Sequence, residues 1–175
     1  MDTADLLASV PALAGAEPVT RVTLPARLDY IHTPGAAQSR FLNALAEKRF
    51  LAERCPKCTR VYIPPKGVCP TCGLATTERL ELPHVGTITT FCIVNIAARG
   101  LDVEVPYCYA YVLLDGAHVS LHARIGDIPH DQVHVGQRVQ PVWNEQKLGP
   151  SLAGISHFRP TGEPDADPES YRRWM

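Results

Sequence analysis

The chain has no long apolar run, and no stretch approaches the roughly 20 residues that a bilayer-spanning helix needs. Its first residues, Met1 to Asp5, are acidic and lack the basic start of a secretory signal. We therefore expect a cytoplasmic protein with no membrane segment. The sequence also lacks a Gly-x-Ser-x-Gly elbow, a phosphate-binding P-loop and a dinucleotide-binding glycine fingerprint. Three common signatures of an independent enzyme are thus missing.

An excess of charge of one sign is missing as well, because the net charge is −1 over 175 residues. A dedicated nucleic-acid-binding protein is expected to be strongly basic, so this composition argues against one. The charge is nevertheless uneven. Residues 39–77 carry seven Lys or Arg against two Glu, a net charge of +5, whereas residues 80–143 carry three Arg against six acidic residues. The basic stretch suits a phosphate-bearing ligand or an acidic partner surface.

Four cysteines are the most informative residues present. Cys55 and Cys58 form one CxxC pair, and Cys69 and Cys72 form a second pair ten residues later. Each CxxC can fold into a knuckle that directs both thiolates at one point, so two knuckles supply four soft ligands for a tetrahedral metal site. The ten-residue interval is slightly shorter than is usual for such sites, but a short β-hairpin spans it.

Zinc is the first expectation for this site, and a single iron in a rubredoxin-like site is the second, because Cys-Pro-x-Cys knuckles suit both metals. The alternatives without metal are two disulfides or four buried thiols. Paired CxxC motifs point to a reducing compartment, where the thiols stay available for metal. A site filled by four cysteines has no open position for substrate, so we expect it to support the fold rather than perform chemistry.

The rest of the chain predicts a mainly β protein. With 45% hydrophobic and 20% charged residues, it suits one globular unit with flexible ends. Residues 1–38, interrupted by prolines, read as an N-terminal extension: either a disordered tail or an arm that contacts a partner, as the apolar Leu28, Tyr30 and Ile31 favour. A helix capped by Ser39 is predicted over residues 39–50, followed by the ribbon to residue 77.

After the second knuckle the apolar residues alternate as in strands, and an Asp115-Gly116 pair marks a hairpin. The expected strands cover Glu78–Pro83, Gly86–Ile96, Tyr107–Leu114, His118–Ile125, Arg138–Trp143 and Leu152–Phe158. Five or six short strands without intervening helices predict a five-stranded OB-like barrel over residues 78–158. The acidic, proline-rich residues 159–175 are expected to be a flexible tail.

A helix, a four-cysteine ribbon and an OB-like barrel in this order resemble a known family. It is the rubredoxin-like zinc-ribbon/OB-fold family, catalogued as domain of unknown function thirty-five and associated with acyl-CoA metabolism. The resemblance covers about residues 39–158. It rests on the run Tyr62-Ile-Pro-Pro-Lys66-Gly-Val-Cys69-Pro-Thr-Cys72-Gly73, preceded by Arg54-Cys-Pro-Lys-Cys58, and on the barrel pieces Gly86-Thr-Ile-Thr-Thr-Phe91, Pro106-Tyr107, Ala110-Tyr-Val-Leu-Leu-Asp-Gly116 and Gly136-Gln-Arg-Val139.

The resemblance implies an accessory subunit with no activity of its own. Members of the family look like helpers of thiolase-superfamily enzymes, including acetoacetyl-CoA thiolases and the aldolases that shorten steroid side chains. The implied role is to bind such an enzyme in a hetero-oligomer and to help bind or channel an acyl-CoA. The four ribbon cysteines carry over directly as the metal ligands.

Cations near the ribbon are the expected contacts for an acyl-CoA or a partner. Arg60 and Lys66 lie on the connection between the knuckles, and Arg99 lies in the loop before Pro106. Guanidinium and ammonium groups both bind phosphate. An ordinary solvated basic face is the plainer interpretation of the same residues.

Other reactive residues receive mainly structural interpretations. Cys92 and Cys108 lie in apolar strand-like runs, where cysteine is usually a small buried hydrophobic residue. His118, Ser120 and His122 are expected on one face of a strand, where they could bind a metal or polarise a substrate carbonyl, or simply face solvent. His130 and His134 flank a loop.

Two further functions compete with the accessory role. The first is single-stranded nucleic-acid binding, since OB-folds and ribbons often serve it. The predicted barrel is acidic and poor in the aromatic platforms that such binding uses, so nucleic acid is not an expected partner. The second is a stand-alone CoA-thioester hydratase or hydrolase that uses the His118 and His122 pair.

Overall fold

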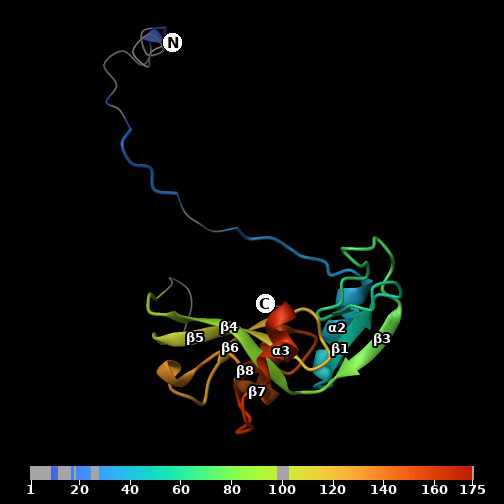
Figure 1. The fold of residues 1–175 in the computed structure, drawn as a ribbon. Helices are drawn as coiled ribbons and strands as arrows, with labels where there is room; N and C mark the ends of the chain where they lie inside the picture. The colour runs from blue at the N-terminus through green and yellow to red at the C-terminus, as the bar shows by residue number, and fades with distance from the viewer. Residues whose placement is uncertain (1–8, 12–16, 18, 25–27, 98–102, 175) are drawn as a thin grey trace. The chain divides into compact units, whose positions relative to one another are not determined.

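The computed structural model describes residues 9–11, 17, 19–24, 28–97 and 103–174. Two compact units are distinguished, Met1–His32 and Thr33–Met175. The described residues of the first unit include exposed apolar side chains, among them Leu28, Tyr30 and Ile31. The second unit holds the ribbon and the barrel (Figure 1). No helix in the described part of the chain is long and apolar enough to cross a membrane.

A helix and a three-stranded sheet form the first part of this unit. Helix α2 covers Ala36–Ala46 and buries Phe41, Ala44 and Leu45, which share one face at helical spacing. Strand β1 (Phe50–Arg54) lies at the centre of the sheet, between β2 (Val61–Tyr62) and β3 (Glu78–Leu82). The sheet therefore frames the four cysteines, because β1 enters the first knuckle, β2 follows it and β3 lies beyond the second.

Several predicted boundaries differ from these elements. The helix begins three residues earlier than Ser39 and ends at Ala46, and the Ser39 hydroxyl donates to the Pro34 carbonyl instead of capping. Phe50, expected to end the helix, starts β1, because its side chain is fully buried in the common core. The Glu78–Leu82 strand pairs with β1 from Phe50–Leu82 to Arg54–Glu78, so it belongs to the ribbon sheet and not to the barrel.

The remaining strands form a closed five-stranded barrel, as predicted. They are β4 (Gly86–Val94), β5 (Tyr107–Leu114), β6 (Leu121–Ile125), β7 (Arg138–Trp143) and β8 (Ile155–Pro160), in the order β4-β5-β6-β8-β7, and β7 pairs back to β4. This is OB-like topology. Strands β6 and β8 are parallel and pair at a single position, Ile125 with Phe158, which is the shortest strand pairing in the barrel.

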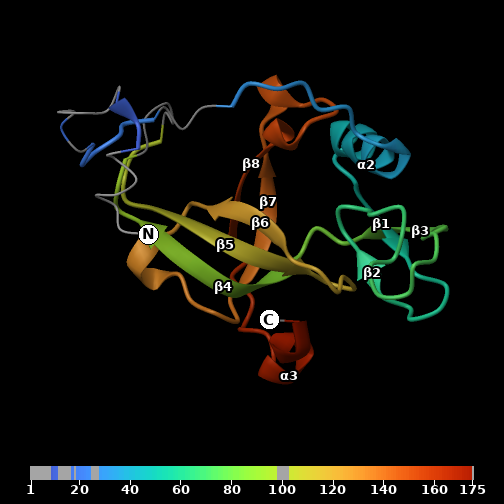
Figure 2. The same cartoon turned by 90° about the horizontal axis from the view of Figure 1, so that it is seen from above.

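The ribbon and the barrel share one hydrophobic core. Buried side chains from α2 and the ribbon sheet, including Phe41 and Phe50, belong to the same cluster as Val112 and Phe158 of the barrel. The Phe50 ring lies 5.5 Å from that of Trp143 and 6.3 Å from that of Phe158. Figure 2 shows the ribbon sheet at one end of the barrel, with β3 leading into β4. Burial of these aromatic side chains couples the stability of the two parts.

The segment after β8 packs on the barrel, although we expected a flexible tail. Tyr171 of helix α3 (Pro168–Tyr171) is 7% exposed and lies in the common core. The Ala166 amide donates to the Gly136 carbonyl, and the Tyr171 hydroxyl approaches Gly136 so closely that a Cβ there would lie 3.2 Å away. Composition suggested flexibility, but Tyr171 supplies the apolar anchor that overrides it.

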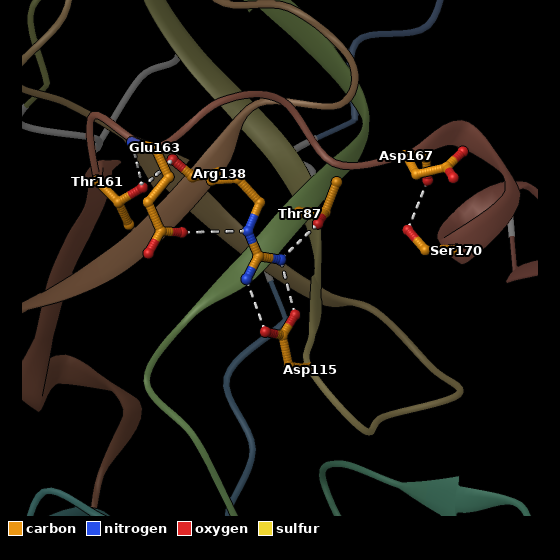
Figure 3. A network of polar contacts seen from close by, with 7 residues as sticks. All are labelled: Thr87, Asp115, Arg138, Thr161, Glu163, Asp167 and Ser170. Atoms are coloured by element: carbon orange, nitrogen blue, oxygen red, sulfur yellow. Dashed lines mark hydrogen bonds and ion pairs between the residues drawn. The ribbon is translucent and has the colours of Figure 1, made fainter.

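An arginine network holds the start of this segment. The Arg138 guanidinium makes two hydrogen bonds to Asp115, at 2.7 and 2.6 Å, and a third to the Thr87 hydroxyl at 2.9 Å (Figure 3). Glu163 lies 3.5 Å from the same guanidinium. Because Arg138 is mostly buried, these contacts fix the hairpin turn at Asp115 and residue 163 against β7.

Candidate metal centre

The two CxxC motifs fold into equivalent knuckles. In the first, the Thr59 amide donates to the Cys55 carbonyl and the Cys55 amide to the Arg60 carbonyl. In the second, the Gly73 and Cys69 amides make the corresponding bonds to Cys69 and Leu74. Thr59 and Gly73 both have positive φ, at 58° and 68°. The same short sequence pattern therefore builds the same loop twice, which turns both pairs of sulfurs toward one point.

The four sulfurs have the spacing of a tetrahedral metal site. The Sγ atoms of Cys55, Cys58, Cys69 and Cys72 all lie within 4.8 Å of one another, and those of Cys58 and Cys69 are 3.6 Å apart. A Zn–S bond of about 2.3 Å implies sulfur separations of about 3.8 Å in a tetrahedron. A disulfide would need about 2.05 Å, and all six cysteines are free. The donor set thus fits a four-coordinate metal ion, as the sequence predicted.

The surroundings of the sulfurs shift the pKa values of two cysteines in opposite directions. The Tyr62 hydroxyl lies 3.2 Å from Cys69 Sγ, and this contact lowers the pKa of the Cys69 thiol to about 6. Burial, together with the neighbouring sulfurs, raises the pKa of Cys72 to about 12. A bound cation offsets such a rise, because metal coordination keeps thiols deprotonated. The sequence analysis missed Tyr62 as a partner of the site, since only folding places it beside Cys69.

A buried carboxylate ties the knuckles to the helix. Glu53 on β1 is fully buried and accepts a 2.6 Å bond from Arg40 of α2 and a 2.7 Å bond from the Thr76 hydroxyl. These contacts join the strand before the first knuckle to the chain after the second. Glu53 carried no functional signal in the sequence, and its role here is to position the ribbon.

The predicted cationic contacts occupy different settings. Arg60 bridges the knuckles through a 3.1 Å bond to the Thr71 hydroxyl. Lys66 is exposed and borders an open hollow of about 620 Å³ between the first turn of α2 and residues 64–68. Arg99 lies outside the described residues. Arg60 does not line the hollow that Lys66 borders, so the structure does not place these two described cations in one site.

The predicted histidine pair separates into two settings. His118 precedes β6, and its Nδ1 accepts a 3.1 Å bond from the Val61 amide, while its own amide donates to the Val61 carbonyl. Burial, helped by nearby arginines, lowers the pKa of His118. His122 stands on β6 between Tyr109 and Tyr111, with ring centroids 4.7 and 5.3 Å away. His118 thus joins barrel to ribbon instead of pairing with His122.

The remaining candidates lie apart from the four cysteines. Cys108 is buried in the barrel core, and burial raises the pKa of its thiol to about 11, so it is a poor nucleophile. Cys92 is exposed on β4, contrary to the expectation that it is buried. His134 pairs with Asp165 at 3.0 Å, and His130 begins a single 3-10 turn. Among the described residues, the four cysteines alone form a group of three or more converging metal-binding side chains.

Two family models match consecutive parts of this architecture. The ChsH2 rubredoxin-like zinc ribbon domain matches residues 42–78, and the ChsH2 C-terminal OB-fold domain matches residues 80–144. Their junction falls within β3, the last strand of the ribbon sheet, a few residues before the barrel begins at Gly86. The ribbon match contains all four cysteines, and the OB-fold match contains strands β4 to β7 of the barrel.

Similar solved structures share the fold. The Ltp2-ChsH2(DUF35) aldolase aligns with a TM-score of 0.58 at 22% identity and covers 74% of this chain and 98% of that one. A DUF35 protein of unknown function from Sulfolobus solfataricus aligns with a TM-score of 0.54 at 18% identity and covers 72% and 84%.

Curated relatives extend the similarity to sequence. A DUF35 domain-containing scaffold protein of Pyrococcus furiosus is 28% identical over 105 residues, which is 59% of this chain and 76% of that protein. The corresponding scaffold protein of Methanocaldococcus jannaschii is 30% identical over 96 residues, which is 54% of this chain and 67% of that protein. With the ribbon, the barrel and these relatives in agreement, the chain belongs to the DUF35 family of zinc-ribbon and OB-fold proteins.

Proposed function

We propose that the chain is a non-catalytic accessory subunit that binds a thiolase-superfamily enzyme, either a thiolase or a retro-aldolase, and helps bind or channel its acyl-CoA. The observation that carries this proposal is the relationship to DUF35 scaffold proteins over two thirds of the length of the Methanocaldococcus relative. The shared fold with an aldolase that includes a DUF35 component adds a class of partner to test. Steroid side-chain thioesters are one substrate class for that test.

The metal in this proposal is structural zinc, with iron as the alternative. Four thiolates fill a tetrahedral zinc shell, which leaves no position for substrate or water. In this role Cys55, Cys58, Cys69 and Cys72 hold the metal, and Tyr62 supports Cys69 as a thiolate. The metal would supply folding free energy to the ribbon and take no part in the reaction of the partner.

The acyl-CoA contacts in this proposal are Arg60 and Lys66, with Arg99 as a further candidate. Lys66 borders the hollow beside α2, and Arg60 stands on the ribbon surface, so both cations are accessible to phosphate groups. The basic ribbon against the acidic barrel gives the chain a polarity that would orient an anionic ligand toward the ribbon.

Co-expression with a thiolase-superfamily protein encoded beside this chain tests the proposal. We expect a stable hetero-oligomer that carries metal by native mass spectrometry, and a partner whose activity or solubility rises in the complex. Lys66→Ala should raise the KM for acyl-CoA without dissociating the complex, whereas Lys147→Ala, which does not line the hollow beside Lys66, should change neither. A chain that stays separate from every such protein would contradict the accessory role.

Nucleic-acid binding keeps one observation in its favour. The outer face of β5 carries Tyr107, Tyr109 and Tyr111 at alternate positions, and the second and third strands of an OB-fold form its usual ligand face. Arg124 on β6 lies opposite Tyr109 and adds one positive charge to this face, but residues 80–143 carry three Arg against six acidic residues. We therefore rank this function second. A salt-dependent gel shift with oligothymidylate, abolished by Tyr109→Ala, would reverse the order.

A further inference from the structure

An apolar hollow lies between the barrel and the C-terminal segment. Its volume is about 580 Å³, and it is lined by Tyr111, Val119, His118 and Trp174 together with Ser120 and the neighbouring threonines of β4. Tyr111 is 49% exposed, so its ring is accessible from solvent. The residues come from segments far apart in the chain, and neither CxxC motif contributes to the lining.

Several polar groups of this lining are already bonded within the protein. The Thr89 hydroxyl donates to the Tyr111 carbonyl at 3.2 Å and lies 3.4 Å from the Ser120 hydroxyl. Because His118 Nδ1 accepts from the Val61 amide, the neutral ring carries its proton on Nε2. The hollow therefore offers mainly apolar surface and aromatic rings, with one N–H donor.

The walls are held in place before any ligand arrives. The Trp174 and His118 rings meet edge to face with centroids 4.4 Å apart, and His118 is bonded twice to Val61. Val119 packs against the cluster that contains the metal-site cysteines. A preformed site binds without a large cost in conformational entropy.

Two arginines that have no acidic partner among the described residues lie next to residues of the lining. Arg60 directly precedes Val61, whose amide bonds to His118, and Arg173 directly precedes Trp174 of the lining; the charges of both arginines help to lower the pKa of His118. Arg173 lies over Trp174 at 5.0 Å, and Arg60 bonds only to the Thr71 hydroxyl among the described residues. Arg54, the third nearby cation, is already paired with Glu78 at 2.7 Å. The first two guanidinium groups remain free to bind an anion.

We propose that this hollow binds a small amphipathic anion, whose apolar chain lies against Trp174, Tyr111 and Val119 and whose carboxylate or phosphate end contacts Arg60 and Arg173. The ligand class is a medium-length acyl chain that carries a negative group. The biological identity of the ligand rests on the proposed function: an acyl thioester of a phosphorylated carrier combines an apolar chain with negative charge. The apolar subsite is separate from the hollow beside Lys66.

Titration of the isolated chain with sodium decanoate, decanol and decanoyl-CoA tests the site through Trp174 fluorescence. Trp143 is the second tryptophan, so Trp174→Phe identifies the signal. We expect decanoate and decanoyl-CoA to change the fluorescence, and decanol to bind more weakly. Arg173→Ala should weaken decanoate binding about tenfold and leave decanol binding unchanged. The control is Arg172→Ala, because Arg172 pairs with Glu169 and does not border the hollow.

Tyr111→Ala supplies a second variant, chosen because an exposed side chain can be removed without unfolding the barrel. It should weaken all three probes, and isothermal titration calorimetry provides a readout that does not depend on tryptophan. Equal binding of decanoate to the wild-type chain and to Arg173→Ala, or no binding at all, would overturn the site. Since no partner is needed, that failure would differ from failure of complex formation.

Discussion

At the scale of single residues, two positions with positive φ decide how the knuckles form. Thr59 and Gly73 follow the second cysteine of each motif and have nearly the same backbone conformation. Glycine adopts this conformation freely, whereas a residue with a Cβ does so at a cost of about 1 kcal/mol. The metal site therefore accepts strain at Thr59 that it avoids at Gly73.

Adding a Cβ at Gly73 and removing the side chain of Thr59 should affect the free energy of unfolding differently. Gly73→Ala should lower the free energy of unfolding by about 1 kcal/mol, and only through the backbone, because no atom lies within 4 Å of the added Cβ. Thr59→Gly should leave stability unchanged or raise it by up to about 0.5 kcal/mol. Urea denaturation of the metal-loaded protein measures both. A neutral Gly73→Ala would mean that the second knuckle tolerates strain as the first does.

At the scale of elements, a buried ion pair and an exposed one connect neighbouring segments in different ways. Glu53 is fully buried between Arg40 and Thr76, and Glu81 of β3 is half-exposed beside Arg49. Both glutamates lie in the same three-stranded sheet. Removal of one member of a buried pair leaves the other charge without compensation, whereas an exposed pair exchanges its partner for water.

The two glutamates therefore offer a matched comparison. Glu53→Gln should destabilise the protein by about 3 kcal/mol, because Arg40 loses its carboxylate in a partly buried position. Glu81→Gln should cost no more than about 0.5 kcal/mol. Urea midpoints of the two variants provide the measurement. Equal effects would show that the Arg40–Glu53 pair is not what holds α2 to the ribbon.

The contact between the C-terminal segment and the barrel has its own pH dependence. The Gln132 carbonyl and Asp165 raise the pKa of His134 above its ordinary value of 6.5. A raised pKa in the folded state means that protonated His134 stabilises the fold. This contribution is complete below pH 6.5 and is lost as the pH rises through the folded-state pKa. Both partners are about half exposed, so the contribution is at most about 0.5 kcal/mol.

Hydrogen exchange measures this effect at the Ala166 amide, which bonds to the Gly136 carbonyl. Its protection factor should fall between pH 5.5 and pH 8 in the wild-type chain and stay constant in His134→Gln. The Tyr171 contact keeps the segment bound in both proteins. If the variant retained the same pH dependence, another titrating group would be responsible.

At the scale of the whole molecule, metal binding and barrel folding are linked through the common core. Structural zinc contributes about 10–16 kcal/mol to small ribbons, and a domain has about 5–15 kcal/mol of stability in total. Phe50 begins β1, the strand that leads directly into the first knuckle, and its ring packs on Trp143 of the barrel. Loss of the metal should therefore destabilise the structure well beyond residues 50–77.

Removal of the metal by a chelator, or by Cys55→Ser, should unfold the ribbon. The same treatment should also lower the melting temperature of the barrel. Circular dichroism reports the overall loss, and NMR signals of β4 amides report the barrel alone. Cys92→Ser is the control, because this exposed cysteine lies outside the metal site. A barrel that melts at an unchanged temperature after chelation would show that the two parts fold independently.

The sequence by itself determined which four cysteines converge as candidate metal ligands, the order of ribbon and barrel, and most barrel strands. These depend on local spacing: CxxC pairs fix where sulfurs can meet, and alternating apolar residues fix which strand face is buried. Only the tertiary structure decided that β3 pairs with β1, that Tyr62 bonds Cys69, and that Tyr171 anchors a segment whose composition resembles a flexible tail. Those contacts join residues far apart in the chain, and their free energy comes from burial in a shared core, which local sequence does not specify.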